Sequence, residues 1–177
     1  MRSPIGTAGV GAAMSAALLL AGCGQAETSL AEDEATVERV ADGDSLVLRG
    51  GARVRLLQID APELGEGECH GRESLRELED MLQPGDAIVL ESDPRLDRID
   101  RYQRLLRYVL SVDSDTNVNV ELVRRGAATP FFRGDRRGEY ADTLLDAVSD
   151  ARDERRGMWR ACRVSWAPQR QVETRRR

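Results

Sequence analysis

The sequence predicts an α+β fold in which a small closed β-barrel of five strands carries about three helices. Two observations support this prediction. Short β-rich runs separated by Gly and Asp turns come first, and helical segments follow the third run and end the domain. The 177 residues, of which 41% are hydrophobic and 32% charged, suit one globular domain with appended segments. This composition fits neither a disordered chain nor a fully membrane-embedded one.

The first three strands are predicted within TVERVADGDSLVLRGGARVRLLQI, residues 36–59. DGD and RGG interrupt its β-rich runs and mark tight turns, as expected for a β-meander. Two further strands are predicted in AIVLES, residues 87–92, and in RLLRYVLSV, residues 104–112. Five strands with a helix after the third favour an OB-fold barrel.

Three helices are predicted from apolar residues at helical spacing. HGRESLRELEDML places Leu75, Leu78 and Leu82 on one face, and QPGD ends this helix. VNVELVRRG has a capping candidate, Asn119, and ends at Gly126, a residue type that commonly follows a helix. The last helix is predicted from about residue 139, with residues 140, 144, 148 and 151 along its apolar face.

Residues 1–22 are predicted to be a signal peptide, because Arg2 precedes the apolar run VGAAMSAALLL, which is too short to span a bilayer comfortably. The following LAGC, ending at Cys23, resembles a bacterial lipobox, in which cleavage exposes the cysteine to diacylglycerol attachment. The alternative is an ordinary secretory signal with a chance cysteine. We therefore expect an exported protein, anchored to the bacterial cell envelope through a lipid on Cys23.

The rest of the chain divides into three predicted parts. Residues 23–36 are small, polar and acidic and are expected to form a flexible tether. Residues 37–162 are expected to form the folded domain, as a monomer. Residues 163–177 are rich in arginine and are expected to be a disordered tail.

Charged residues mark a candidate site in and after a predicted core strand. In VRLLQIDAPE, Arg55 lies inside the strand, and Asp60 and Glu63 follow its end. An unpaired buried charge is costly, so this pattern indicates a structural ion pair or a functional site. Asp44 in DGDS and Arg104 in DRYQR are further candidates.

These side chains suit phosphate chemistry. Asp44 and Asp60 both lie at strand ends, and two carboxylates close in space make a hard-oxygen site suited to Ca²⁺. Two arginines match the paired oxygens of a phosphate, and Glu63 remains as a base for water. The formal net charge of −5 excludes a general polyanion binder, so a nucleic acid would need such a local cluster. Each residue alone also has an ordinary structural explanation, such as a turn or a surface ion pair.

Four segments identify a likeness to a known family. VADGDSLVL, VRLLQIDAPE, DRYQRLLRYV and VNVELVRRGAA resemble, in this order, the signature segments of the staphylococcal nuclease family. The resemblance covers nearly all of residues 37–162. It implies an OB-type barrel with three helices and a Ca²⁺-dependent phosphodiesterase that leaves 3′-phosphate ends on DNA or RNA.

The resemblance assigns roles to six positions. The metal ligands are Asp44, Asp60 and the main-chain carbonyl of Ala61. The catalytic residues are Glu63, as general base or water-orienting group, and the phosphate-binding arginines Arg55 and Arg104.

Aromatic residues and departures from the family pattern complete this expectation. Tyr102 matches an aromatic residue beside the family's binding pocket, and Phe131 and Phe132 lie near positions where tyrosines are common, with Phe132 predicted to contact substrate. Gln103 stands where the family usually has glycine, which could shift the backbone at Arg104. Ser45 replaces a common threonine.

The remaining cysteines and the lone histidine have structural interpretations. With Cys23 lipidated, Cys69 and Cys162 remain in an oxidising setting, and related exported nucleases often carry such a pair, so we expect a disulfide. His70 is interpreted as a capping or solvent-exposed residue. Two other functions stay open: a catalytically inactive module that binds nucleic acid or protein, and an envelope scaffold. The presence of all five charged site residues favours the enzyme.

Overall fold

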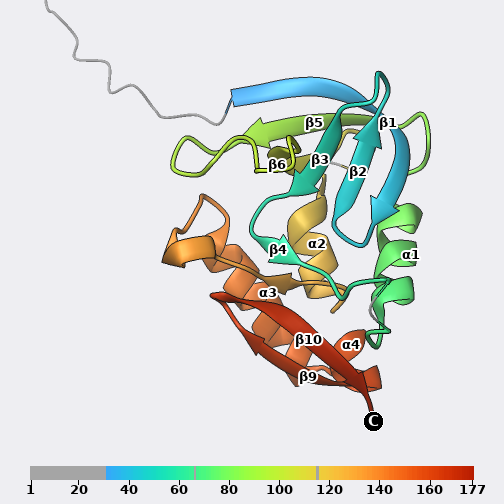
Figure 1. Ribbon diagram of the computed structural model, residues 1–177, viewed down its shortest axis with the longest axis vertical. Coiled ribbons are helices and arrows are strands. Elements are labelled where there is room, and N and C mark those ends of the chain that lie inside the picture. The colour runs from blue at the N-terminus through green and yellow to red at the C-terminus, as the bar shows by residue number, and fades with distance from the viewer. Residues whose placement is uncertain (1–30, 66, 115) are drawn as a thin grey trace, which may run out of the picture.

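The computed structural model describes residues 31–65, 67–114 and 116–177. Five strands close a barrel in this part of the chain: β1 (Ala31–Asp42), β2 (Ser45–Leu48), β3 (Arg53–Leu56), β5 (Ala87–Ser92) and β6 (Leu105–Ser111). Antiparallel pairing joins them in the order β3-β2-β1-β5-β6, and parallel pairing of β3 with β6 closes the ring (Figure 1). The predicted α+β barrel of the OB type is confirmed.

Strand β1 turns a corner of the barrel. Its residues 31–36 pair with β5, and residues 37–42 pair with β2. Two register irregularities lie in the second half, and such irregularities bend a strand and increase its twist. At the following turn, a Cβ on Gly43 would lie 2.9 Å from the Cβ of Ala61, so this close approach requires glycine. The turn thereby brings residues 42–44 against Ala61, which directly follows the short strand at residues 59–60.

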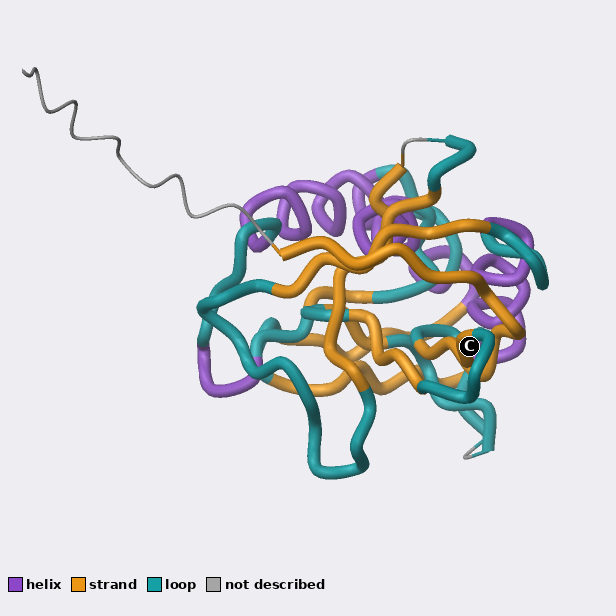
Figure 2. The backbone as a smooth tube through the Cα atoms, turned by 90° about the horizontal axis from the view of Figure 1, so that it is seen from above, coloured by secondary structure: helices purple, strands orange, loops and turns teal. Residues whose placement is uncertain are grey.

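The helices lie outside the barrel strands, and Figure 2 shows them in purple toward the edge of the molecule. The helices are α1 (Gly71–Met81), α2 (Val118–Arg124), α3 (Ala141–Asp153), α4 (Met158–Ala161) and the 3₁₀ turn η1 (Arg133–Asp135). The short strands are β4 (Ile59–Asp60), β7 (Thr116–Asn117) and β8 (Thr129–Pro130); β4 pairs with β8, and β7 pairs antiparallel with the end of β6.

One apolar core joins the barrel to the helices. The barrel contributes side chains that are fully buried, among them Leu46, Val54, Ile88 and Val109. Helices α1, α2 and α3 contribute Leu78, Leu122 and Leu144, also fully buried. The three helices occupy the predicted positions, and Gly126 has the positive φ of 71° expected after a helix C-terminus.

The cap of α2 differs from the prediction. Asn117, not Asn119, caps the helix, and its side chain accepts a hydrogen bond from the Val120 N–H. Asn119 is buried instead, where its amide donates to the Leu57 carbonyl and accepts from the Val109 N–H. The two asparagines look alike in sequence, and only the tertiary fold decides which one faces the barrel.

Both predicted flexible ends differ from the structure. The chain is already in β1 at Ala31, so residues 31–36 belong to the barrel and not to a tether. The remaining part of that tether, Cys23 and the predicted signal peptide lie outside the described residues. Among the described residues, no helix is long and apolar enough to cross a membrane.

The expectation of a disordered tail is wrong. Residues 162–176 form an antiparallel hairpin of β9 (Cys162–Ala167) and β10 (Arg170–Arg176), which lies below the barrel beside α4 (Figure 1). Val172 and Thr174 alternate with exposed polar residues and are buried against the domain. This period of two is the strand pattern, hidden in sequence by the surrounding arginines.

Candidate active site

The predicted site residues converge on one cavity at an edge of the barrel. It has a volume of about 530 Å³ and is lined by Asp44, Arg55, Glu63, Tyr102 and Arg104, among others. These residues come from the turn after β1, from β3, from the loop after β4 and from the loop before β6. The buried Asp60 stands next to the cavity and contacts Arg55.

Arg55 is the centre of the charged cluster. Its Nη1 donates to the carbonyls of Leu56 and Ile59, at 2.8 Å each. Its Nη2 lies 2.8 Å from Asp44 Oδ2 and 3.1 Å from Asp60 Oδ1. The strand tolerates an arginine because both nitrogens have acceptors and two carboxylates balance the charge.

Asp44 is held in place by its neighbours. Its Oδ1 accepts a hydrogen bond from the Ser45 hydroxyl, and its Oδ2 accepts one from the Ala61 N–H at 3.1 Å. Serine at position 45 therefore supplies the same hydroxyl donor that a threonine would supply. Ala61 is buried and joins the cluster through its N–H, and the predicted role of its carbonyl as a metal ligand stays a prediction.

Asp60 is the most deeply buried carboxylate of the cluster, with 2% of its surface exposed. Burial raises the pKa of Asp60. The positive charge of Arg55 acts to lower this pKa, and the negative charge of Asp44 acts to raise it. Its Oδ2 accepts a hydrogen bond from the Val172 N–H at 2.8 Å, and the nearby Gln171 side chain acts to lower its pKa. Both residues come from β10, the predicted disordered tail.

Glu63 lies exposed at the cavity rim. Its pKa is raised to about 7, first by loss of hydration in the cavity and then by the negative charges of Asp42, Asp44 and Asp60. A pKa near neutrality is suited to a general base.

The main chain fixes the loop that carries Glu63. The Glu63 N–H donates to Glu68 Oε2 at 2.9 Å. Behind it, a Cβ on Gly71 would lie 2.6 Å from the Glu63 carbonyl oxygen, so only glycine lets the first turn of α1 pack this closely.

Asp42 is a site residue that the sequence reasoning missed. It lines the cavity, and burial together with the charge of Asp44 raises its pKa, although a hydrogen bond from the Gly43 N–H opposes the shift. The sequence contained a signal for Asp42, because a DGD turn at the end of a strand can place both of its aspartates at the same edge of the barrel.

Arg104 is held by a separate turn. Its Nε donates to Asp100 Oδ2 at 2.7 Å, and its main-chain N–H donates to Asp100 Oδ1 at 2.9 Å. Burial would raise the pKa of Asp100, but the hydrogen bonds from Arg104 and Tyr102 outweigh burial and lower it. Gln103 has a φ of 60°, in the left-handed region, which explains why glycine suits this position and shows that glutamine keeps the backbone turn.

The aromatic residues divide between the cavity and the core. Tyr102 is 53% exposed, with the guanidinium of Arg104 5.5 Å from its ring centre. Phe131 is partly buried and lines the cavity. Phe132 is fully buried in the core, so its predicted contact with substrate is wrong. Of two adjacent phenylalanines in an extended segment, only one can face the cavity.

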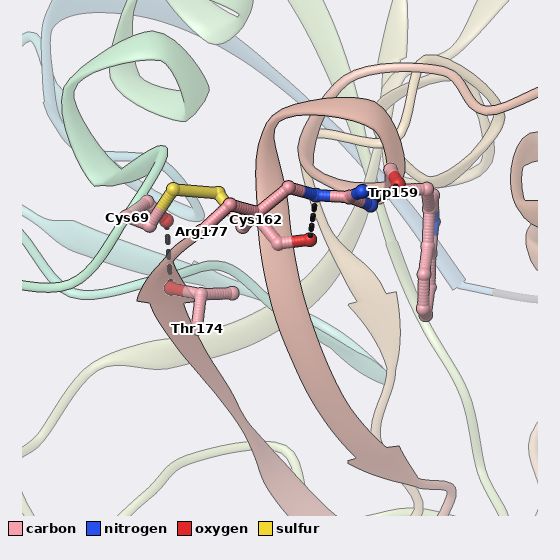
Figure 3. Close-up of a disulfide and its surroundings, with 5 residues drawn as sticks. All are labelled: Cys69, Trp159, Cys162, Thr174 and Arg177. Carbon is pink, nitrogen blue, oxygen red and sulfur yellow. Dashed lines mark hydrogen bonds between the residues drawn. A yellow bond between two sulfur atoms is a disulfide. The ribbon is translucent and has the colours of Figure 1, made fainter.

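The predicted disulfide between Cys69 and Cys162 is present, with a Cα–Cα distance of 6.0 Å (Figure 3). It ties the segment before α1 to the start of β9. His70 stands at the N-cap position of α1 with a φ of 77°, but its side chain makes no capping hydrogen bond. It is partly buried, and burial lowers its pKa, so neither interpretation of His70 holds in full.

The donor set fits a hard divalent cation in its chemistry. Asp44 and Asp60 each turn an oxygen toward the same cationic Nη2 of Arg55, which shows that this pair of carboxylates attracts positive charge. Asp42 and Glu63 add further carboxylates at the same cavity. Among the described residues no group of three or more histidine, cysteine or acidic side chains is already arranged around a metal position.

Comparisons with known proteins agree with this geometry. Residues 53–161 match the family model described as staphylococcal nuclease homologue. The chain is 32% identical over 143 residues to Endonuclease YhcR of Bacillus subtilis (strain 168), and the aligned region makes up 72% of this chain but 11% of that protein. It is 31% identical over 134 residues to Micrococcal nuclease of Shigella flexneri, which covers 70% of this chain and 71% of the relative.

Proposed function

Because the chain belongs to the staphylococcal nuclease family, we propose that it is a Ca²⁺-dependent nuclease that hydrolyses phosphodiester bonds of DNA or RNA to 3′-phosphate products. The observation that carries this proposal is the convergence of Arg55, Arg104 and Glu63 on one cavity beside Asp44 and Asp60. The relatives' printed names, an endonuclease and a micrococcal nuclease, support the same class of reaction.

The two arginines supply the phosphate site. The side chain of Arg104 is 27% exposed, and its Nε is held by Asp100. Arg55 is fixed on the barrel wall and supplies a second positive charge to the same cavity. Planar, preorganised donors stabilise the extra negative charge that builds on phosphorus during displacement.

Glu63 is the base of the proposed reaction. With a pKa near 7 it is ionised above neutrality and can take a proton from the attacking water. The water oxygen bonds to phosphorus while the bond between phosphorus and the 5′ oxygen breaks. The 5′ oxygen takes a proton from solvent and leaves as a hydroxyl, and the phosphate stays on the 3′ oxygen of the other product.

The proposed cation ligands are Asp44, Asp60 and the carbonyl of Ala61. A bound Ca²⁺ would supply Lewis-acid stabilisation of the negative charge on the phosphate. Because Arg55 Nη2 contacts both carboxylates, we expect its hydrogen bonds to them to weaken when a cation takes their oxygens.

We further propose that the enzyme is exported and anchored to the cell envelope through a diacylglycerol on Cys23, and that it acts as a monomer. The lipobox-like LAGC supports the anchor. A two-chain lipid is sufficient for stable membrane attachment, whereas a single chain is marginal. Changing Cys23 to serine should release active enzyme into the medium, and a wild-type protein that is already fully soluble there would contradict the anchor.

A nucleic-acid zymogram tests the proposed activity. Purified protein should clear both a DNA gel and an RNA gel, or one of the two, in the presence of Ca²⁺. EGTA should abolish clearing, and excess Ca²⁺ should restore it. Nucleic-acid binding without clearing would favour the inactive binding module, and neither binding nor clearing would favour the scaffold.

A further inference from the structure

The C-terminal hairpin reaches the candidate site through two inward-facing residues of β10. Val172 donates its N–H to Asp60 Oδ2 at 2.8 Å. Two residues further along, the Thr174 hydroxyl donates to the Cys69 carbonyl at 2.6 Å (Figure 3). Asp60 and Cys69 bound the loop that carries Glu63. The hairpin is therefore attached at both ends of the catalytic loop.

The bond from Val172 is made possible by an irregularity in the hairpin. The register between β9 and β10 shifts between Arg170 and Glu173, and Val172 lies within that shift. Its N–H donates to the buried carboxylate of Asp60, which makes a charge-assisted hydrogen bond. With Oδ2 held by β10, Oδ1 is the oxygen that faces Arg55.

Gln171 is a second residue of the same strand at the site. Its side chain is exposed and lines the cavity, and it acts to lower the pKa of Asp60. Two neighbouring residues of β10 thus act on one carboxylate, Val172 through its main-chain N–H and Gln171 through its side chain.

Other contacts hold the hairpin rigidly against the domain. The disulfide fixes Cys162 at the start of β9. The Trp166 Nε1 donates to the Pro130 carbonyl at 2.8 Å, and the Phe132 N–H donates to the Pro168 carbonyl at 2.6 Å. A strand held at so many points can fix the orientation of a side chain that it contacts.

We propose that the β9–β10 hairpin is a working part of the active site, in which Gln171 and Val172 are positioning residues that orient Asp60 for cation binding. This inference rests on the proposed Ca²⁺-dependent function. Groups that orient a metal ligand without touching the metal commonly change metal affinity by about 10-fold to 100-fold when removed. The hairpin therefore contributes to the cation affinity of the site as well as packing against the domain.

The test is calorimetric titration of the metal-free protein with CaCl₂, which needs no catalysis. Gln171→Ala should weaken Ca²⁺ affinity by about 10-fold with the melting temperature unchanged, because Gln171 is exposed. Gln169→Ala is the matched control on the same hairpin, because the Gln169 side chain bonds to Asp135, outside the site, at 3.2 Å. It should leave the affinity unchanged.

A second pair of variants separates the Val172 N–H from its side chain. Val172→Pro removes the donor, whereas Val172→Ala keeps it and removes buried methyl groups. We expect Val172→Pro to lower Ca²⁺ affinity by at least about 10-fold, and Val172→Ala to lower the melting temperature with nearly normal affinity. If Val172→Pro does not fold, the Gln171 and Gln169 pair alone decides the question.

The outcomes distinguish this inference from the proposed function. Wild-type protein that binds no Ca²⁺ would overturn the proposed metal dependence and, with it, this inference. Wild-type binding that is equally strong in Gln171→Ala and in folded Val172→Pro would overturn the role of the hairpin alone.

Discussion

Arg55 and Arg104 line the same cavity, but different kinds of structure hold them. Arg55 sits in β3 with 14% of its side chain exposed, and it has two carbonyl and two carboxylate partners. Arg104 follows a turn and is 27% exposed, and Asp100 is the one hydrogen-bond partner of its guanidinium among the described residues. The contacts of Arg55 help to hold the barrel together, whereas Arg104 is positioned by the turn that precedes it. Loss of the first should therefore harm stability and loss of the second should harm mainly turnover.

Removing Arg55 should have the largest effect. Arg55→Ala leaves Asp44 and Asp60 buried side by side without a cation, which should cost about 3–5 kcal/mol in the free energy of unfolding. Urea denaturation followed by circular dichroism measures this. Arg104→Ala is the matched variant and should cost at most about 1 kcal/mol, because its ion pair is partly exposed. Equal losses would contradict the comparison.

Arg104→Lys tests the role of the second arginine in catalysis. Lysine keeps the charge but loses the planar fork, so we expect single-turnover cleavage to fall by about 100-fold to 1,000-fold with little change in affinity for the strand. Rates and affinities on one labelled strand separate these effects. A loss confined to affinity would show that Arg104 acts in the ground state.

The pH dependence of cleavage tests the electrostatics of the cavity that both arginines line. Without a cation Glu63 has a pKa of about 7, so it is protonated at lower pH and its ability to act as a base is lost there. At a fixed saturating cation concentration we expect kcat/KM to fall about tenfold per pH unit below the midpoint of this titration. A bound cation would stabilise the carboxylate and move the midpoint to lower pH. Glu63→Gln should remove this inflection from its residual rate, and an unchanged inflection would assign it to another group.

Gln103→Gly should have the smallest effect and concerns the turn before Arg104. The φ of 60° at Gln103 is unfavourable for a residue with a side chain, and glycine adopts it freely. We expect the free energy of unfolding to rise by about 0.5–1 kcal/mol, after the greater freedom of glycine in the unfolded chain is included. Gln103→Ala keeps the unfavourable backbone and serves as the control. A loss of stability in the glycine variant would show that the Gln103 side chain supports the turn.

The sequence could predict the barrel and the charged cluster because both have local signals. The turns at DGD and RGG divide the strands, and Arg55 stands out as a charge inside an apolar run. The turns and the buried charge are residue types that the chain shows directly. The disulfide between Cys69 and Cys162, which is present, was expected from the cysteine count together with the resemblance to exported nucleases.

The features that were missed depend on long-range contacts. The role of Val172 involves a main-chain N–H that bonds to Asp60, 112 positions earlier, and no side-chain pattern announces it. Phe131 and Phe132 are indistinguishable until the fold decides which one enters the core. Asn117 and Asn119 pose the same problem at α2. In each case tertiary packing selects between local choices of similar energy.

The central claim is that this constellation cuts nucleic acid with Glu63 as its base. The most direct measurement is single-turnover cleavage of one labelled strand by wild-type protein and by Glu63→Ala, with Ca²⁺ and with EGTA. We expect the wild type to cut only with Ca²⁺, and Glu63→Ala to bind the strand normally while cutting about 100-fold to 10,000-fold more slowly. Equal cutting by Glu63→Ala, or no cutting by the wild type at any Ca²⁺ concentration, would contradict the account.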